Sequence, residues 1–117
     1  MRLISKTTNK TLVPNLEVAN GIWPRMKGLL GRSELPATEA LLIKGCDSIH
    51  TFFMRFAIDV VFVDSKMIVK KTVARVKPGR LVYGHWGAAH VIEFSEGFLE
   101  NNPIQIGEQL HVDSTLS

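Results

Sequence analysis

Cysteine is almost absent from this chain: Cys46 is the single one among 117 residues. One thiol cannot form an internal disulfide, which excludes the disulfide-rich scaffolds of small secreted domains. A lone thiol in a small domain is also typical of a reducing compartment. We therefore expect a cytoplasmic protein.

Long apolar runs are missing as well. The apolar stretch at residues 60–63 is far shorter than the roughly 20 residues that span a bilayer. The first ten residues lack the apolar run of about 7–15 residues that a signal peptide needs. The sequence therefore predicts neither an export signal nor a membrane partner.

Neither sign of charge strongly prevails. The formal net charge is only +3, with a pI of about 9.2. This excess is compatible with weak attraction to polyanions and does not by itself select a partner. Hydrophobic residues make up 45% of the chain and charged residues 21%, as in folded globular proteins rather than disordered ones. At this length we expect one domain, residues 1–117.

Most of the secondary structure that the sequence predicts is β-strand. Stretches rich in β-branched and aromatic residues predict strands at residues 3–7, 11–17, 40–43, 52–54, 58–63, 67–76, 90–95 and 109–112. Turn residues at 8–10 and 64–66 predict hairpins between their neighbours. Pro14 places the second strand towards a sheet edge, because proline has no N–H to give to a ladder.

Helical signals are few. Asn20 is a candidate N-cap for a helix that ends at Gly31, with apolar residues at helical spacing between them: Ile22, Met26, Leu29 and Leu30. Residues 97–102 predict a short helical turn, and residues 32–39 and 84–89 predict loops. Because strands and helices do not alternate, we expect a mainly β (α+β) fold. It would be a small antiparallel, barrel-like or open β domain with one short helix packed against it.

Four sequence motifs resemble one family. Residues 49–64, IHTFFMRFAIDVVFVD, look like the central signature of the family known as domain of unknown function 192. GLLGR at 28–32, VIE at 91–93 and IGE at 106–108 are similar to its other motifs, in the same order. The resemblance implies a small, single-domain, β-rich protein and no known reaction. The chain departs from the family at Ala57, where proline is common, and in lacking the export signal of several relatives.

Asp59 interrupts the most apolar segment, residues 58–63. A carboxylate removed from water costs several kcal/mol unless it is paired or hydrogen-bonded, so Asp59 needs a partner. Arg55 lies about 13 Å away on an unbroken strand and reaches Asp59 only if the chain bends between them. Arg25 and Arg32 are the other candidates. A structural role and a ligand-binding role both remain open.

Glu93 is flanked by apolar residues in the same way. It is either an exposed strand residue or part of a polar pocket shared with Asp59, since both lie in the family-like motifs. Two carboxylates in different environments can act as acid and base. A small hydrolase-type enzyme that uses Asp59 and Glu93, or a bound metal, is therefore the alternative function.

His50 and Thr51 precede the aromatic segment and are candidates to line the same pocket. Cys46 and His50 are spaced C-x3-H, and His85 and His90 are spaced H-x4-H, but neither matches a standard zinc spacing. Cys46 would be a nucleophile with His50 as base only if a turn brought them together. We expect no metal and no cofactor.

A basic stretch begins in the second strand of the predicted hairpin and continues past it: Lys70, Lys71, Arg75, Lys77 and Arg80. Two aromatic residues nearby, Tyr83 and Trp86, are able to stack on bases. Lysines on an edge strand also prevent edge-to-edge aggregation. Weak nucleic-acid binding is therefore the third hypothesis.

The first hypothesis is a cytoplasmic binding module for a small molecule or an extended peptide. Its ligand would occupy a shallow polar cleft around a buried Asp/Arg pair, lined by His50, Thr51, Arg55, Asp59, Glu93 and Arg25.

Overall fold

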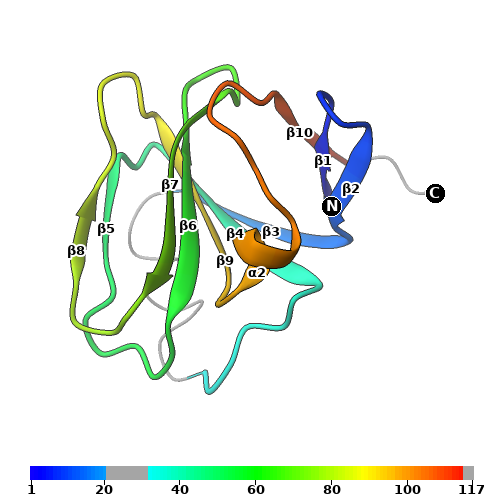
Figure 1. The fold of residues 1–117 in the computed structure, drawn as a ribbon. Helices are drawn as coiled ribbons and strands as arrows, with labels where there is room; N and C mark the ends of the chain where they lie inside the picture. The colour runs from blue at the N-terminus through cyan, green and yellow to red at the C-terminus, as the bar shows by residue number, and fades with distance from the viewer. Residues whose placement is uncertain (21–31, 115–117) are drawn as a thin grey trace.

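The structure is a computed structural model that describes residues 1–20 and 32–114 (Figure 1). The elements are β1 (Arg2–Ser5), β2 (Lys10–Val13), β3 (Asn15–Asn20), β4 (Glu39–Lys44), β5 (Ser48–His50), β6 (Ile58–Val63), β7 (Val69–Val76), β8 (Leu81–Tyr83), β9 (His90–Ser95), α2 (Phe98–Asn101) and β10 (Leu110–Asp113). In the described part of the chain, residues in strands far outnumber residues in helices, so the expected mainly β class is confirmed.

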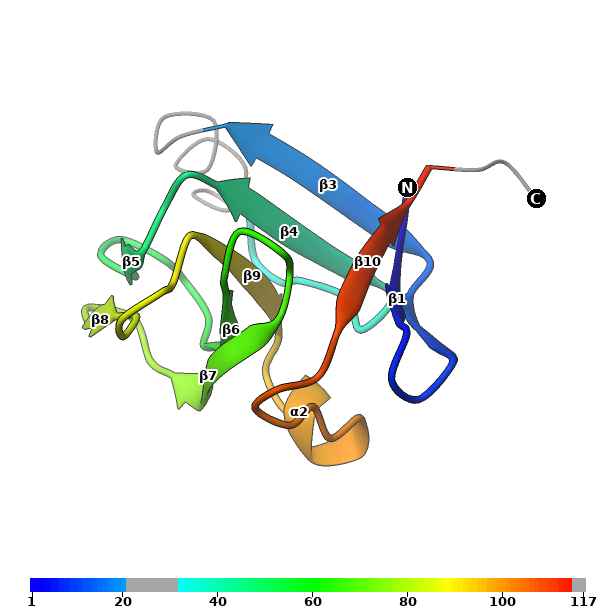
Figure 2. The ribbon, with the colours of Figure 1, turned by 90° about the horizontal axis from the view of Figure 1, so that it is seen from above.

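The described strands form three sheets. Five strands are ordered β3-β4-β9-β6-β7, three are ordered β10-β1-β2, and β5 pairs with β8 as a two-stranded ribbon. In Figure 2 the three-stranded sheet and the ribbon lie on opposite sides of the five-stranded sheet. The described sheets stay open, so the open form of the expected fold is right and the barrel form is not.

Several predicted strands match the structure closely. β6 and β9 begin and end where the sequence predicts, and the β1–β2 and β6–β7 hairpins form at the predicted turns. Pro14 separates β2 from β3, so residues 11–17 are not one strand. β3 pairs with β4 in parallel, in contrast to the expected antiparallel order.

One prediction in the signature segment is wrong. Residues 52–54 form a turn instead of a strand, because the N–H of Met54 donates to the carbonyl of Thr51 and Phe53 takes a left-handed φ of 67°. Asn20, the candidate N-cap, is the last residue of β3. The predicted helix that follows it lies outside the described residues, whereas the predicted turn at 97–102 is confirmed as α2.

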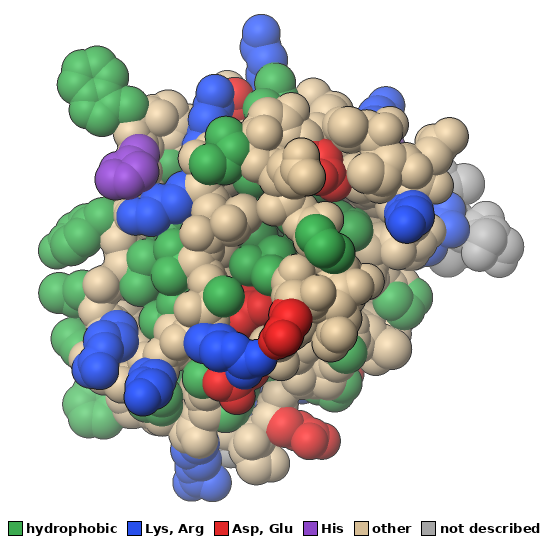
Figure 3. Space-filling model, in the orientation of Figure 1, with side chains coloured by type: hydrophobic (Ala, Val, Ile, Leu, Met, Phe, Trp, Pro, Cys, Tyr) green, Lys and Arg blue, Asp and Glu red, His purple; other side chains and the backbone are tan. Residues whose placement is uncertain are grey.

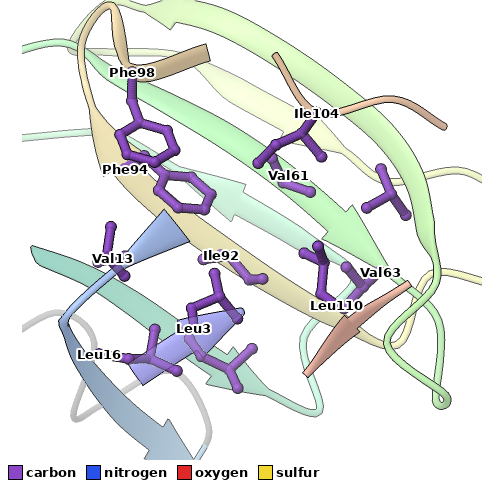
Figure 4. Packing of buried hydrophobic residues seen from close by; sticks show 13 residues of the cluster. Leu3, Val13, Leu16, Val61, Val63, Ile92, Phe94, Phe98, Ile104 and Leu110 are labelled. Atoms are coloured by element: carbon purple, nitrogen blue, oxygen red, sulfur yellow. The ribbon is translucent and has the colours of Figure 1, made fainter. Parts of the chain in front are cut away.

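The core has one cluster on each face of the five-stranded sheet. Side chains alternate along a strand, so Val61 and Phe94 point to one face while Val60 and Val91 point to the other. The first cluster packs under the three-stranded sheet and α2, where the rings of Phe94 and Phe98 stack with centroids 4.4 Å apart (Figure 4). The second packs under the β5–β8 ribbon, where Ile49 and Val82 join it.

Candidate functional site

Asp59 is fully buried, and its carboxylate binds main-chain N–H groups from two distant segments. Oδ1 accepts from the N–H of Arg75 (2.9 Å) and of Gly97 (3.3 Å), and Oδ2 accepts from the N–H of Leu99 (2.8 Å). Gly97 is the N-cap of α2 and has a φ of 87°, and Arg75 has a φ of 55°. The carboxylate therefore fixes the start of α2 and an irregular point of β7.

Thr51 is also fully buried and fixes a second turn. Its hydroxyl donates to the carbonyl of Lys77 (2.6 Å) and accepts from the N–H of Arg80 (3.0 Å). Its main chain bonds to Arg80 and Gly79 as well. Thr51 thus joins the end of β5 to the turn that leads into β8.

Asp59 and Glu93 do not share a pocket. Asp59 is paired across the sheet with Phe94, which belongs to the first cluster, whereas Glu93 is paired with Val60, which belongs to the second. Directly opposed residues point to the same face of a sheet, so the two carboxylates point to opposite faces. Glu93 is fully buried between Leu41 and Val60, which excludes the exposed alternative.

The expected Asp/Arg pair is not formed among residues 1–20 and 32–114. Arg55 is exposed, and within the described residues no hydrogen bond or ion pair joins it to Asp59. Arg32 pairs with Glu39 instead, with 3.3 Å between nitrogen and oxygen. Arg25 lies outside the described residues. Asp59 needed a partner, as the sequence indicated, but main-chain donors fill that role.

Glu108 and Asp64, two other acidic residues of the family-like motifs, also accept hydrogen bonds within the fold. Glu108 accepts the hydroxyl of Ser5 (2.6 Å) and the N–H of Gln105 (3.1 Å). Asp64 accepts the N–H groups of Lys66 (2.8 Å) and Ile68 (2.9 Å). The bond from Ile68 is the main reason why the pKa of Asp64 falls below its ordinary value of 3.8, with help from Lys66 and from Lys70, although partial burial opposes the shift.

Cys46 and His90 form hydrogen bonds with main-chain groups. The thiol of Cys46 donates to the carbonyl of Ser48, and Nδ1 of His90 accepts the N–H of Gly45. The described residues contain no group of three or more His, Cys, Asp or Glu side chains arranged to hold a metal ion. No helix in residues 1–20 and 32–114 is long and apolar enough to cross a membrane.

The β5–β8 ribbon and the loops beside it carry large apolar side chains on the surface. We define the exposed apolar face as Phe52, Phe53, Leu81, Tyr83 and Trp86. Phe53 is 85% exposed and Trp86 is 98% exposed. Figure 3 shows hydrophobic side chains along the edge of the molecule that β8 forms in Figure 1, with Lys and Arg beside them.

The exposed apolar face follows the β5–β8 ribbon and its two flanking loops. Leu81 and Tyr83 point outward, opposite the core residue Val82. His50 is paired with Leu81 across the ribbon, and its ring stacks on Phe52 with centroids 5.1 Å apart. The sequence pointed to His50 through its motif, but it did not reveal that its neighbours are exposed.

Gly84 ties the loop that carries Trp86 to the ribbon. Its N–H donates to the carbonyl of Asp47 (2.7 Å). A Cβ at this position would lie 2.8 Å from that same carbonyl oxygen and 2.7 Å from Cβ of Ala88. Only glycine permits this close approach, so the loop begins from a fixed point.

The basic stretch is partly neutralised. Arg75 pairs with Glu100 and Glu96, which raise the pKa of its guanidinium, with a smaller contribution from Asp59. Lys70 pairs with Asp64. Within the described residues Lys77 and Arg80 make no ion pair, and Nζ of Lys71 donates to the carbonyl of Tyr83 (2.8 Å).

The comparison with known families agrees with the motifs. The profile of DUF192, described as "Uncharacterized ACR", matches residues 3–112. The chain belongs to this family. Among DUF192 relatives, a UPF0127 protein of Thermococcus sibiricus is 29% identical over 112 residues, which cover 92% of this chain and 72% of that protein. A UPF0127 protein of Pyrococcus furiosus is 38% identical over 64 residues, which cover 54% and 53%.

Two solved structures share the fold. A protein of unknown function from Novosphingobium aromaticivorans has a TM-score of 0.83 at 19% identity, covering 96% of this chain and 84% of that one. A Sinorhizobium meliloti protein, provisionally described as a transcription regulator, has a TM-score of 0.80 at 19% identity, covering 94% and 89%. At this identity the DUF192 fold is shared, and nothing further follows.

Proposed function

We propose that this DUF192 protein is a docking module that binds an extended acidic peptide segment through the exposed apolar face. The observation that carries the proposal is the placement of five large apolar side chains in water on one ribbon and its flanking loops. Contiguous exposed apolar residues on a folded protein mark interaction sites.

The local backbone supports a role beyond packing. A left-handed φ of 67° is unfavourable for a bulky residue such as Phe53, and the side chain gains little burial in return. Strain of this kind persists where the surroundings fix it, and here Thr51 and its bonds to the 77–80 turn do so. The fold holds Phe53 in position for contact with a partner.

The charges around the face favour an acidic partner. Arg55, Lys77 and Arg80 are exposed and unpaired within the described residues, and Lys71 lies against Tyr83. Asp47 is an exposed acid near the face. Aromatic residues and arginine supply most of the binding energy at protein interfaces, so this combination suits a peptide that alternates apolar and acidic residues.

The shape of the face favours an extended ligand. Its residues lie on the β5–β8 ribbon, which connects the 51–57 loop to the 84–89 loop (Figures 1 and 2), and on those two loops. Small molecules prefer an enclosed pocket, and a hydrolytic pair is not assembled because Asp59 and Glu93 point to opposite faces. An extended chain is able to contact both loops at once.

Nucleic acid is the alternative ligand. The Sinorhizobium meliloti protein of similar fold is provisionally described as a transcription regulator, which is a reason to test it. Aromatic side chains with cations bind single strands. However, the ion pairs of Arg75 and Lys70 remove two cations from the basic stretch. Binding would then depend on a few exposed charges and be lost as salt is raised to physiological levels.

Selection of phage-displayed random peptides on the immobilised protein tests the proposal. We expect enriched sequences that combine acidic with aromatic or aliphatic residues and that lose binding to Phe53→Ala and to Arg80→Gln. The matched control is Ile106→Ala, since Ile106 is 71% exposed but lies outside the face.

Two results would contradict the proposal. One is a set of peptides that binds the Phe53→Ala variant as well as the parent. The other is single-stranded oligonucleotide binding that survives physiological salt and depends on the same residues, which would assign the face to nucleic acid.

A further inference from the structure

A second surface lies at the other side of the five-stranded sheet. It is a cleft of about 330 Å³ between the ends of β4 and β9, the β6–β7 turn and β10. Its apolar lining consists of Leu42, Met67, Leu110 and Val112. Its polar lining consists of Lys44, Ser65, Lys66, His90, Gln109 and His111. We call it the basic cleft, because it contains two lysines, two histidines and no acidic residue.

Strand register brings two of these groups together. Lys44 is paired directly with His90, so their side chains leave the sheet on the same face, a few ångströms apart. That face is the one that carries Leu42 and Ile92 of the first cluster. Nδ1 of His90 accepts the N–H of Gly45 (3.0 Å), so in the neutral ring the proton is on Nε2, which is left as a donor.

The rim of the cleft is held by hydrogen bonds. Oδ1 of Asp64 binds the main chain of Lys66 and Ile68, which fixes the turn and the left-handed φ of 65° at Met67. Nε2 of Gln109 donates to the carbonyls of Lys66 (2.7 Å) and Leu110 (2.8 Å), which joins that turn to β10. The cleft therefore exists before any ligand arrives.

The nearby acids already have cationic or main-chain partners. Asp64 pairs with Lys70 and the turn N–H groups, and Asp113, two residues beyond His111, pairs with Arg2. The positive charge of Lys44 and Lys66 is thus not balanced by a carboxylate in the lining.

We infer that the basic cleft binds a small phosphomonoester that carries a short apolar group. The phosphate would accept hydrogen bonds from the ammonium groups of Lys44 and Lys66 and from His90, since charge-assisted bonds to phosphate are the strong ones. The apolar group would lie on Leu42 and Leu110, which form the buried floor. The volume suits a small metabolite rather than a polymer. The site is separate from the exposed apolar face and does not depend on its function.

Chemical-shift titration of the 117-residue protein tests this inference with four probes: phenyl phosphate, inorganic phosphate, benzoate and phenol. We expect phenyl phosphate to bind more tightly than inorganic phosphate or benzoate, and phenol to show no saturable binding. The shifts should concentrate at residues 42–44, 65–67, 90 and 109–112. The double variant Lys44→Gln/Lys66→Gln should lose about tenfold in affinity, because each lysine contributes a charge-assisted bond.

The matched control is Lys6→Gln/Lys10→Gln, which removes two exposed lysines at the β1–β2 turn and should leave the affinity unchanged. Equal losses in both double variants, or shifts spread over all surface lysines, would overturn the inference. So would the absence of saturable phenyl phosphate binding in the parent protein. Tighter binding of benzoate than of phenyl phosphate would reassign the cleft to carboxylates and would contradict the phosphate assignment.

Discussion

Residues 49–64 contain two neighbouring regions with opposite properties. All six residues of β6 are buried, and its one charged side chain, Asp59, is bound by three main-chain N–H groups. The turn just before it exposes Phe52 and Phe53. In the first region a buried polar group has its hydrogen-bond partners within the fold. In the second region apolar side chains are exposed and contribute little to the core. The comparison agrees with a structural role for the buried region, and it supports the proposal that the exposed region contacts a partner.

The largest expected effect comes from Asp59→Asn. An amide retains one acceptor and directs an NH₂ group at main-chain donors, so stability should fall by about 2–4 kcal/mol. Urea unfolding measures this loss, and Asp47→Asn, at an exposed carboxylate, is the control. If Asp59→Asn unfolds at the same urea concentration as the parent, the structural role of the carboxylate is wrong.

Thr51→Val should have a smaller effect. Valine has nearly the same shape but leaves the carbonyl of Lys77 and the N–H of Arg80 without the hydroxyl, at a cost of about 1–2 kcal/mol. Thr51→Ser keeps both bonds and should lose less. Thr11→Val, at an exposed position, serves as the control. A larger loss for Thr51→Ser than for Thr51→Val would show that packing, not the hydroxyl, is what the site needs.

A smaller effect on stability is expected from the protonation of Asp64 at low pH. The folded state lowers its pKa below 3.8, so the carboxylate stabilises the fold above that pH, and the contribution disappears as pH falls through the lowered value. Asp64→Asn should therefore narrow the difference in melting temperature between pH 7 and pH 3. An NMR titration that finds the pKa of Asp64 above 3.8 would contradict the account.

The fold was predictable where patterns were long. β6 and β9 are six-residue runs that the sequence marks clearly, and their bounds were right. β5 and β8 have three residues each, too few for alternation to appear, and they were missed. The apolar residues 52–54 resembled a strand, but the bond from Met54 to the carbonyl of Thr51 closes a turn there.

The candidate site was only partly predictable. The burial of Asp59 and its need for a partner follow from its apolar neighbours. The partners themselves lie at Arg75, Gly97 and Leu99, up to 40 residues away, and main-chain donors leave no mark in a sequence. Asp59 and Glu93 were grouped because both lie in motifs, whereas the register that separates them onto two faces is set by strand pairing.

The most direct test of the central claim is Phe53→Gly, read for both stability and peptide binding. Glycine adopts a left-handed φ without strain, which offsets its greater freedom in the unfolded chain. We therefore expect the free energy of unfolding, measured in urea, to stay the same or rise by up to about 1 kcal/mol, while binding of the selected acidic peptides is lost. Loss of stability with peptide binding unchanged would contradict the assignment of Phe53 to an interaction surface.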